Sequence, residues 1–228
     1  MVALDDFSTL DRIGIDESGK GDYFGPLVVA AVFVTQATQR DLSLMQVRDS
    51  KKISDGRIQE LAPEIRRLCP HSIVAIGPQR YNELYAKIRN LNRLLAWGHA
   101  KALENLLGQV ECSLAIADQF GDEALILRAL QEKGKQIRLV QRTKAEADLA
   151  VAAASVVARA EFLSRLNRLS QDVKTTLPKG ASPAVELAAK MVVKKHGPER
   201  LGTVAKLHFK TTKQILGGNY ADSPTSKS

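Results

Sequence analysis

Cysteine is scarce in this chain, because Cys69 and Cys112 are the only two among its 228 residues. They do not form a C-x-x-C pair, and the sequence shows no His/Cys ligand set of the kind that holds zinc. Both cysteines stand among apolar residues. We therefore interpret them as buried, reduced thiols of a cytoplasmic protein.

Long hydrophobic runs and a secretory leader are missing as well. No apolar stretch reaches the ~18 residues that a membrane span needs. The first residues carry Asp5, Asp6 and Asp11, which argues against a signal peptide. We expect no membrane association.

Aromatic residues make up only 5% of the chain, whereas apolar residues make up 44%. The core should therefore consist mostly of Ala, Val, Leu and Ile. Lysine and arginine (33) outnumber aspartate and glutamate (25), which gives a formal charge of +8. Such an excess favours a polyanionic partner such as nucleic acid, although a solvated basic surface explains the charge equally well.

The chain is organised around residues Arg12–Phe33. Ile13–Ile15 has the alternation of a strand, and Leu27–Val34 is a β-branched run typical of a buried strand, so we predict a hairpin. Two carboxylates, Asp16 and Glu17, follow the first strand. Neighbouring strand residues point to opposite faces, so both can serve one site only if the strand ends and twists there.

Three interpretations of these residues compete. The segment Gly14–Lys20 satisfies the P-loop pattern G-x-x-x-x-G-K, but Gly21 stands where a Ser or Thr must bind Mg²⁺. An exposed acidic turn is the second interpretation. The third is a metal site in which Asp16 and Glu17 hold a hard cation while the glycine-rich backbone and its lysine receive a phosphate.

Periodicity along the rest of the chain predicts an α/β pattern with one hairpin. Ser54 or Asp55 is a plausible helix N-cap, and Gly98 is a possible interruption in a long helix. The predicted strands are 71–77, 113–117 and 136–140. The predicted helices are 56–69, 81–88, 91–107, 124–131, 143–170 and 183–195.

Seven sequence blocks resemble the prokaryotic type 2 ribonucleases H. In the first block, Ser18 and Lys20 occupy the variable positions as they do in the ribonuclease HIII branch. The blocks run in family order across about residues 12–215. They are Ile15–Val28, Asp49–Lys52, Ile116–Phe120, Thr143–Glu146, Ala152–Arg159, Leu177–Ser182 and Lys206–Lys210.

The resemblance implies a ribonuclease H-like fold, with a five-stranded mixed sheet flanked by helices and a C-terminal helical region. We expect one catalytic domain over residues 1–217 and a mobile tail over 218–228. Ribonucleases HIII usually carry an N-terminal substrate-binding domain. The first motif here begins at Arg12, so we expect a catalytic domain without that extension.

Four acids fall at the positions that the resemblance marks as catalytic and metal-binding: Asp16, Glu17, Asp118 and Glu146. Asp148 competes with Glu146, and Glu146 also suits the first turn of a helix without any function. Clustered carboxylates repel one another, and a divalent cation removes that conflict. All-oxygen ligands favour Mg²⁺ or Mn²⁺ and support two-metal phosphodiester hydrolysis.

Further residues are candidates for binding nucleic acid. Backbone N–H groups of the first loop can approach a 2′-hydroxyl, lysines can bind phosphates, and Ser155 can offer a hydroxyl or simply pack between helices. His208 can reach the substrate or lie in the core. The candidates are Ser18, Gly19, Lys20, Gly21, Lys51, Lys52, Lys144, Ser155, His208 and Lys210.

The expected function is a metal-dependent endoribonuclease that cuts the RNA strand of RNA–DNA hybrids, leaving a 3′-hydroxyl and a 5′-phosphate, with no obligate protein partner. The ribonuclease HII branch uses a C-terminal tyrosine to recognise a lone ribonucleotide. No tyrosine lies between Leu201 and Phe209, and Tyr23 is expected to pack beside Phe24. We therefore expect a need for several consecutive ribonucleotides. A non-catalytic basic nucleic-acid-binding module is the alternative.

Overall fold

The computed structural model describes residues 7, 9–119, 124–131 and 134–217. The chain divides into two compact units. The sheet unit comprises residues 1–18, 28–74 and 90–161, and the helical unit comprises residues 19–27, 75–89 and 162–228. The predicted mobile tail, 218–228, and Phe120 of the third motif lie outside the described residues.

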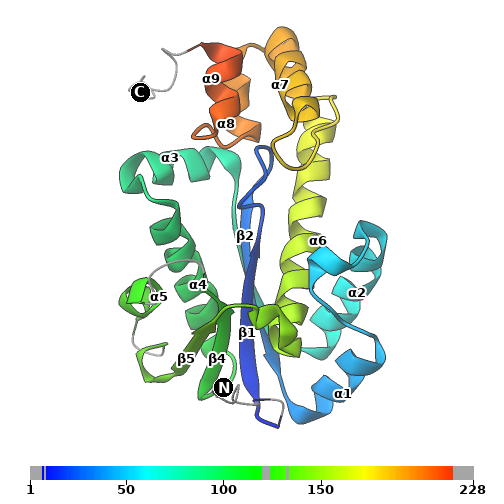
Figure 1. The fold of residues 1–228 in the computed structure, drawn as a ribbon, viewed down its shortest axis with the longest axis vertical. Coiled ribbons are helices and arrows are strands. Elements are labelled where there is room, and N and C mark those ends of the chain that lie inside the picture. Colours follow the sequence, from blue (N-terminus) through cyan, green and yellow to red (C-terminus); the bar gives the residue numbers. More distant parts are fainter. Residues whose placement is uncertain (1–6, 8, 120–123, 132–133, 218–228) are drawn as a thin grey trace. The chain divides into compact units, whose positions relative to one another are not determined.

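A five-stranded mixed sheet has the strand order β3-β2-β1-β4-β5 (Figure 1). Strand β1 pairs antiparallel with β2 and parallel with β4, and β4 pairs parallel with β5. The predicted hairpin and sheet are therefore confirmed. The strands are β1 (Arg12–Ser18), β2 (Leu27–Val34), β3 (His71–Ile76), β4 (Leu114–Asp118) and β5 (Arg138–Arg142).

Among its described residues, the sheet unit contains all or part of five α-helices. Ser54 caps one of them, because its hydroxyl accepts a hydrogen bond from the Arg57 backbone N–H. Among the described residues, no helix has both the length and the apolar character to cross a membrane. The helices are α1 (Gln36–Leu44), α2 (Asp55–Leu68), α4 (Leu91–Leu107), α5 (Ala124–Ala129) and the first part of α6 (Leu149–Asp172).

Helices cover both faces of the sheet, with α4 and α5 on one face and α6 on the other (Figure 1). Ile13 and Ile15 pack into the core cluster on the α4 face. Gly14, between them, faces α6, where a methyl group would lie 2.0 Å from the carbonyl carbon of Ala150. Along β1, odd-numbered side chains therefore face α4 and even-numbered side chains face α6.

Two predicted helix features are wrong. Helix α4 runs unbroken through Gly98, because this glycine lets the helix approach β2: an added Cβ would lie 2.9 Å from Cγ2 of Val29. Helix α6 begins at Leu149 rather than Thr143, since Lys144 adopts a left-handed conformation (φ 58°) and a short 3₁₀ turn, Ala145–Ala147, comes first.

The two cysteines are free thiols in different environments. Cys69 is buried, as predicted, whereas Cys112 is only half-buried, so that prediction was wrong for Cys112. Its position just before β4 explains the difference, because the chain there has not yet entered the core. Burial raises the pKa of the Cys69 thiol to about 11, which keeps it protonated and unreactive.

The helical unit is built around residues 19–27, which follow β1. The backbone N–H of Gly25 donates to the Val204 carbonyl, and the Asn82 side chain bonds to the backbone of Gly202 and Leu207. Two helices of this unit, α8 and α9, were not among the predicted ranges. The helices are α3 (Pro78–Ile88), the last turns of α6, α7 (Pro183–His196), α8 (Leu201–Val204) and α9 (Lys210–Leu216).

Candidate active site

Neighbouring strand ends of the sheet unit carry the predicted acids. Ile15 pairs with Ala117 in parallel register, so Asp16 and Asp118 are the next residues along adjacent strands. Glu146 lies in the turn that follows β5, the strand beside β4. Because these strands are parallel, their carboxyl ends meet at one edge of the sheet. Sequence-distant acids therefore converge on that edge.

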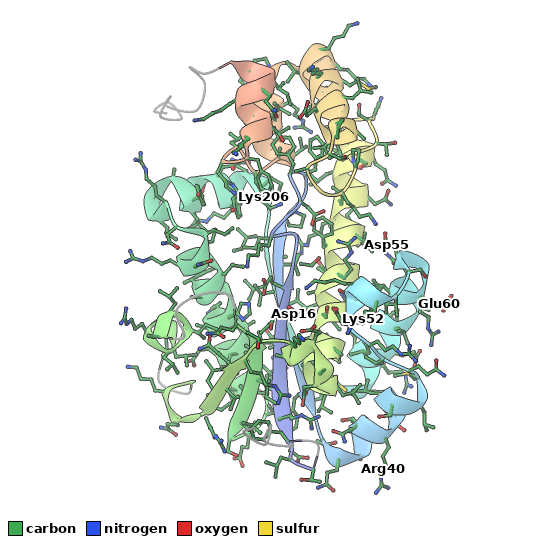
Figure 2. The ribbon with its side chains drawn as sticks, in the orientation of Figure 1. Asp16, Arg40, Lys52, Asp55, Glu60 and Lys206 are labelled. Atoms are coloured by element: carbon green, nitrogen blue, oxygen red, sulfur yellow. The ribbon has the colours of Figure 1, made fainter. Side chains whose placement is uncertain are left out.

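Asp16 is only 8% exposed and faces α6 (Figure 2). Burial raises its pKa to about 7, and the neighbouring Glu17 carboxylate adds to this rise. The nearby Ser155 hydroxyl and a hydrogen bond from the Glu17 backbone N–H (2.8 Å to Oδ1) oppose it. The group is therefore held by donors but lacks a counterion strong enough to keep it fully ionised at neutral pH.

Glu17 points the other way, toward α4. Strand β1 ends at Ser18, one residue beyond Glu17, where the glycine-rich segment begins. Pairing with β2 runs through Ser18, opposite Val28, and keeps the strand regular. The two carboxylates thus leave opposite faces of β1 near the end of the shorter strand β4.

Two buried residues of the site were not predicted. His99 on α4 bonds through Nε2 to Oε2 of Glu17 at 3.0 Å. Asp49, 4% exposed, accepts hydrogen bonds from the Ser155 hydroxyl (3.1 Å) and the Lys51 backbone N–H (3.3 Å). A polar residue at an apolar helix position was the available signal for His99, and the D-S-K-K motif was the signal for Asp49.

The pKa of Lys51 shows that several carboxylates lie near its ammonium group. Burial by itself would lower the pKa of its ammonium group, but surrounding carboxylates outweigh burial and raise the pKa above its usual value. The carboxylates that do so belong to Asp16, Asp49, Asp118 and Glu17, in that order. Lys51 therefore shares one electrostatic environment with three of the four predicted acids.

Ser155 lies inside the site, 1% exposed, on α6. Its hydroxyl lies 2.7 Å from the Ser50 hydroxyl and donates to Asp49. The structure thus gives Ser155 protein partners, while its predicted contact with nucleic acid stays a prediction. Lys52 and Lys144 are exposed in the same unit, where Figure 2 shows Lys52 on the segment before α2.

Asp148, the alternative to Glu146 as the fourth acid, makes other contacts in the structure. Its carboxylate accepts from Nε of Arg12 at 2.8 Å, in an ion pair whose side chains are 2% and 5% exposed. Its other oxygen accepts the Ala150 backbone N–H at 2.8 Å and so caps the start of α6. Glu146 is half-exposed. This difference favours Glu146 as the fourth acid.

The remaining predicted contacts belong to the helical unit rather than to the acidic edge of the sheet unit. Gly19 needs its glycine, because its φ is 92° and an added Cβ would lie only 2.2 Å from the Pro26 carbonyl oxygen, whereas Gly21 faces open space. His208 is exposed, and its ring stacks on Tyr85 with centroids 4.4 Å apart. Lys20 is half-buried and Lys210 is exposed.

Comparisons with known proteins cover most of the chain. The family model described as Ribonuclease HII matches residues 13–212. Ribonuclease HIII of Protochlamydia amoebophila is 50% identical over 206 residues, which are 90% of this chain and 68% of that protein. Ribonuclease HIII of Chlamydia pneumoniae is 44% identical over 210 residues, 91% of this chain and 70% of that protein.

A solved structure gives the same result. The crystal structure of Bst-RNase HIII in complex with Mn²⁺ superimposes with a TM-score of 0.87 at 35% identity, covering 92% of this chain and 70% of that one. With this coverage, the similarity extends over parts of both units. The chain therefore belongs to the ribonuclease H family that the Ribonuclease HII model describes, and it is a hydrolase similar to the ribonuclease HIII branch.

Proposed function

We propose that this chain cuts the RNA strand of RNA–DNA hybrids as an endonuclease, with Asp16, Glu17, Asp118 and Glu146 as its catalytic acids. The observation that carries the proposal is the convergence of these acids at the ends of β1 and β4 and in the turn after β5. Ribonucleases H act on RNA–DNA hybrids, and this chain belongs to that family.

We further propose that the four acids hold Mg²⁺ or Mn²⁺. The described residues contain no group of three or more His, Cys, Asp or Glu side chains already closed around a metal position. The donors nevertheless suit a hard cation, because all four are carboxylates. Burial and the neighbouring Glu17 carboxylate raise the pKa of Asp16, and a bound cation would favour its ionised form. The Mn²⁺ complex of Bst-RNase HIII supports this assignment.

Two such ions held by these four acids would lower the pKa of a water and stabilise the leaving oxygen of the phosphodiester, chemistry that would leave a 3′-hydroxyl and a 5′-phosphate. The chain's own residues prepare the ligands. The Glu17 backbone N–H donates to Asp16, and the Ala145 N–H lies 3.4 Å from Oδ1 of Asp118. These donors orient two carboxylates that come from different strands.

Substrate binding is assigned to both units, which we propose act as one catalytic domain over residues 1–217. In the sheet unit the proposed contacts are Ser18, Lys51, Lys52, Lys144 and Ser155. In the helical unit they are Gly19, Lys20, Gly21, His208 and Lys210. Backbone N–H groups of the glycine-rich loop read 2′-hydroxyls, and the lysines neutralise phosphates. Two free thiols support a cytoplasmic location.

A need for several consecutive ribonucleotides completes the proposal. Tyr23, the tyrosine nearest the predicted substrate loop, is 0% exposed, packs against Phe24 with centroids 4.9 Å apart, and shares a hydrogen bond with Thr212. A buried ring cannot stack on a sugar at a junction between RNA and DNA. This supports the prediction that a lone ribonucleotide is a poor substrate.

The test uses end-labelled duplexes of one sequence: an RNA–DNA hybrid, a DNA duplex with four consecutive ribonucleotides, a duplex with one ribonucleotide, and plain DNA. With Mg²⁺ or Mn²⁺ we expect strong cleavage of the first two and weak cleavage of the third. Binding of the hybrid with no cleavage in either metal would instead establish the non-catalytic module. Equal rates with one and four ribonucleotides would contradict the substrate preference alone.

A further inference from the structure

His99 is a polar side chain inside an apolar helix face. It lies on α4 with an exposed fraction of 0%, and its helix neighbours Ala96, Ala100 and Leu103 belong to the core that covers the sheet. A buried imidazole loses its hydration, which costs free energy unless the ring makes hydrogen bonds. A residue of this kind calls for an explanation beyond packing.

The Glu17 carboxylate is its partner, with Nε2 and Oε2 3.0 Å apart. An ionised carboxylate only accepts hydrogen bonds, so Nε2 carries the proton and donates it. The contact joins α4 to β1 across a sequence separation of 82 residues. The contact therefore forms only when the helix packs against the sheet.

The donor is also held rigidly. Gly98, its neighbour in the chain, lets α4 approach so closely that an added Cβ would lie 2.9 Å from Val29 on β2. An imidazole has only two side-chain torsions, and close packing restricts both of them. The position of Nε2 is thus set by the helix and the sheet together, and Nε2 lies 3.0 Å from one oxygen of the Glu17 carboxylate.

Two direct roles in the chemistry do not fit His99. Its Nε2 is committed to Glu17, and hard cations prefer oxygen ligands, so His99 is not suited to bind Mg²⁺ or Mn²⁺ itself. Because the ring has no exposed surface, it also cannot touch a duplex or accept a proton from a solvent water. The remaining role acts through Glu17.

We propose that His99 is a positioning residue that fixes the orientation of the Glu17 carboxylate toward the divalent metal and thereby sets metal affinity. The inference rests on the proposed function, since it requires Glu17 to bind the metal. Hydrogen bonds to the far side of metal-binding groups typically change metal affinity or activity 10- to 100-fold. No sequence motif pointed to this role.

The test compares His99→Leu with His99→Gln. Glutamine retains a side-chain N–H donor of similar reach, whereas leucine fills the space without one. Mn²⁺ binding to the protein alone is measured from the electron paramagnetic resonance signal of free Mn²⁺. We expect His99→Leu to weaken binding about 10- to 100-fold and His99→Gln to restore most of it. The matched control, His71→Gln, changes a ring bonded to the Cys69 carbonyl and should bind as the parent does.

A double-mutant cycle with Glu17→Ala separates positioning from general packing. If His99 acts through Glu17, adding His99→Leu to Glu17→Ala causes no further loss of Mn²⁺ affinity. Additive losses, or parental affinity in His99→Leu, would overturn the inference while leaving the function intact. Parental affinity and cleavage in Glu17→Ala itself would instead overturn the proposed function. If His99→Leu does not fold, His99→Asn, whose amide is too short to reach Glu17, replaces it.

Discussion

Single residues decide the electrostatics of the acidic edge. Asp16 is identifiable in the sequence because its motif is distinctive, but its environment is not. Ser155 and Glu17 surround it only after α6 packs on β1, and Asp49 arrives from a different segment. For the same reason the role of His99 could not be predicted from the sequence, because its partner Glu17 is 82 residues away in the chain. Motifs predicted the acids, and tertiary packing supplied the residues that hold them.

The raised pKa of Asp16 makes the metal-free protein sensitive to pH. Its pKa is 3.8 when unperturbed and about 7 in the folded protein, so the folded state binds more protons between those values. This stability is fully present below about pH 4 and is lost as pH rises through 7. At 1.36 kcal/mol per pKa unit, the loss reaches at most about 4 kcal/mol.

Urea unfolding with a chelator present, from pH 5 to 8, measures this effect. We expect the free energy of unfolding of Asp16→Asn to fall less over this range than that of the parent. Added Mn²⁺ should stabilise the parent more at pH 8 than at pH 5, because the metal competes with the proton. Parallel pH curves for the two proteins in chelator would mean that Asp16 titrates normally.

At the scale of elements, the hairpin and the sheet strands were predictable because their alternation and turn residues agree with the tertiary fold. The long helix after β5 was predicted to begin too early, since its Ala-rich sequence favours a helix but Lys144 turns the chain first. Gly98 was misjudged because a glycine that weakens an isolated helix here permits close contact with β2. Helix propensity depends on the local sequence alone, so it does not predict which distant residue a glycine will contact.

Substitutions at Gly19 and Gly21, the two glycines of the first loop, should affect different properties: stability at Gly19 and hybrid binding at Gly21. Gly19→Ala forces a side chain into a left-handed conformation and against the Pro26 carbonyl, so we expect destabilisation of more than about 2 kcal/mol. Gly21→Ala meets nothing within 4 Å, and its stability should change by less than about 0.5 kcal/mol. If the Gly21 backbone approaches the substrate, however, hybrid affinity falls.

Thermal unfolding and hybrid binding of both variants check this. A stable Gly21→Ala protein with weakened hybrid binding supports the proposed substrate loop. Full binding by that variant would remove Gly21 from the interface, and a fully stable Gly19→Ala protein would contradict the loop conformation itself.

At the scale of the whole molecule, the net positive charge and the acidic edge have opposite effects on a nucleic-acid partner. The formal charge of +8 predicts attraction to a polyanion, and such binding weakens as salt rises. The acids, in contrast, gather at one edge of the sheet, where a substrate phosphate is repelled unless cations intervene. Net charge can be calculated from composition, whereas the gathering of the acids at one edge depends on the parallel register of β1, β4 and β5.

Asp118→Asn tests the central claim most directly, because it removes the negative charge of one proposed metal ligand without altering the shape of the side chain. The measurement is the cleavage rate and the affinity for one labelled RNA–DNA hybrid, in Mg²⁺ and in Mn²⁺, beside the control Asp41→Asn on the exposed side of α1. We expect cleavage to fall at least about 1,000-fold, with hybrid affinity within a few-fold of the parent, and the control to cleave normally. Cleavage by Asp118→Asn at the parental rate would contradict the assignment of the acidic edge as the active site.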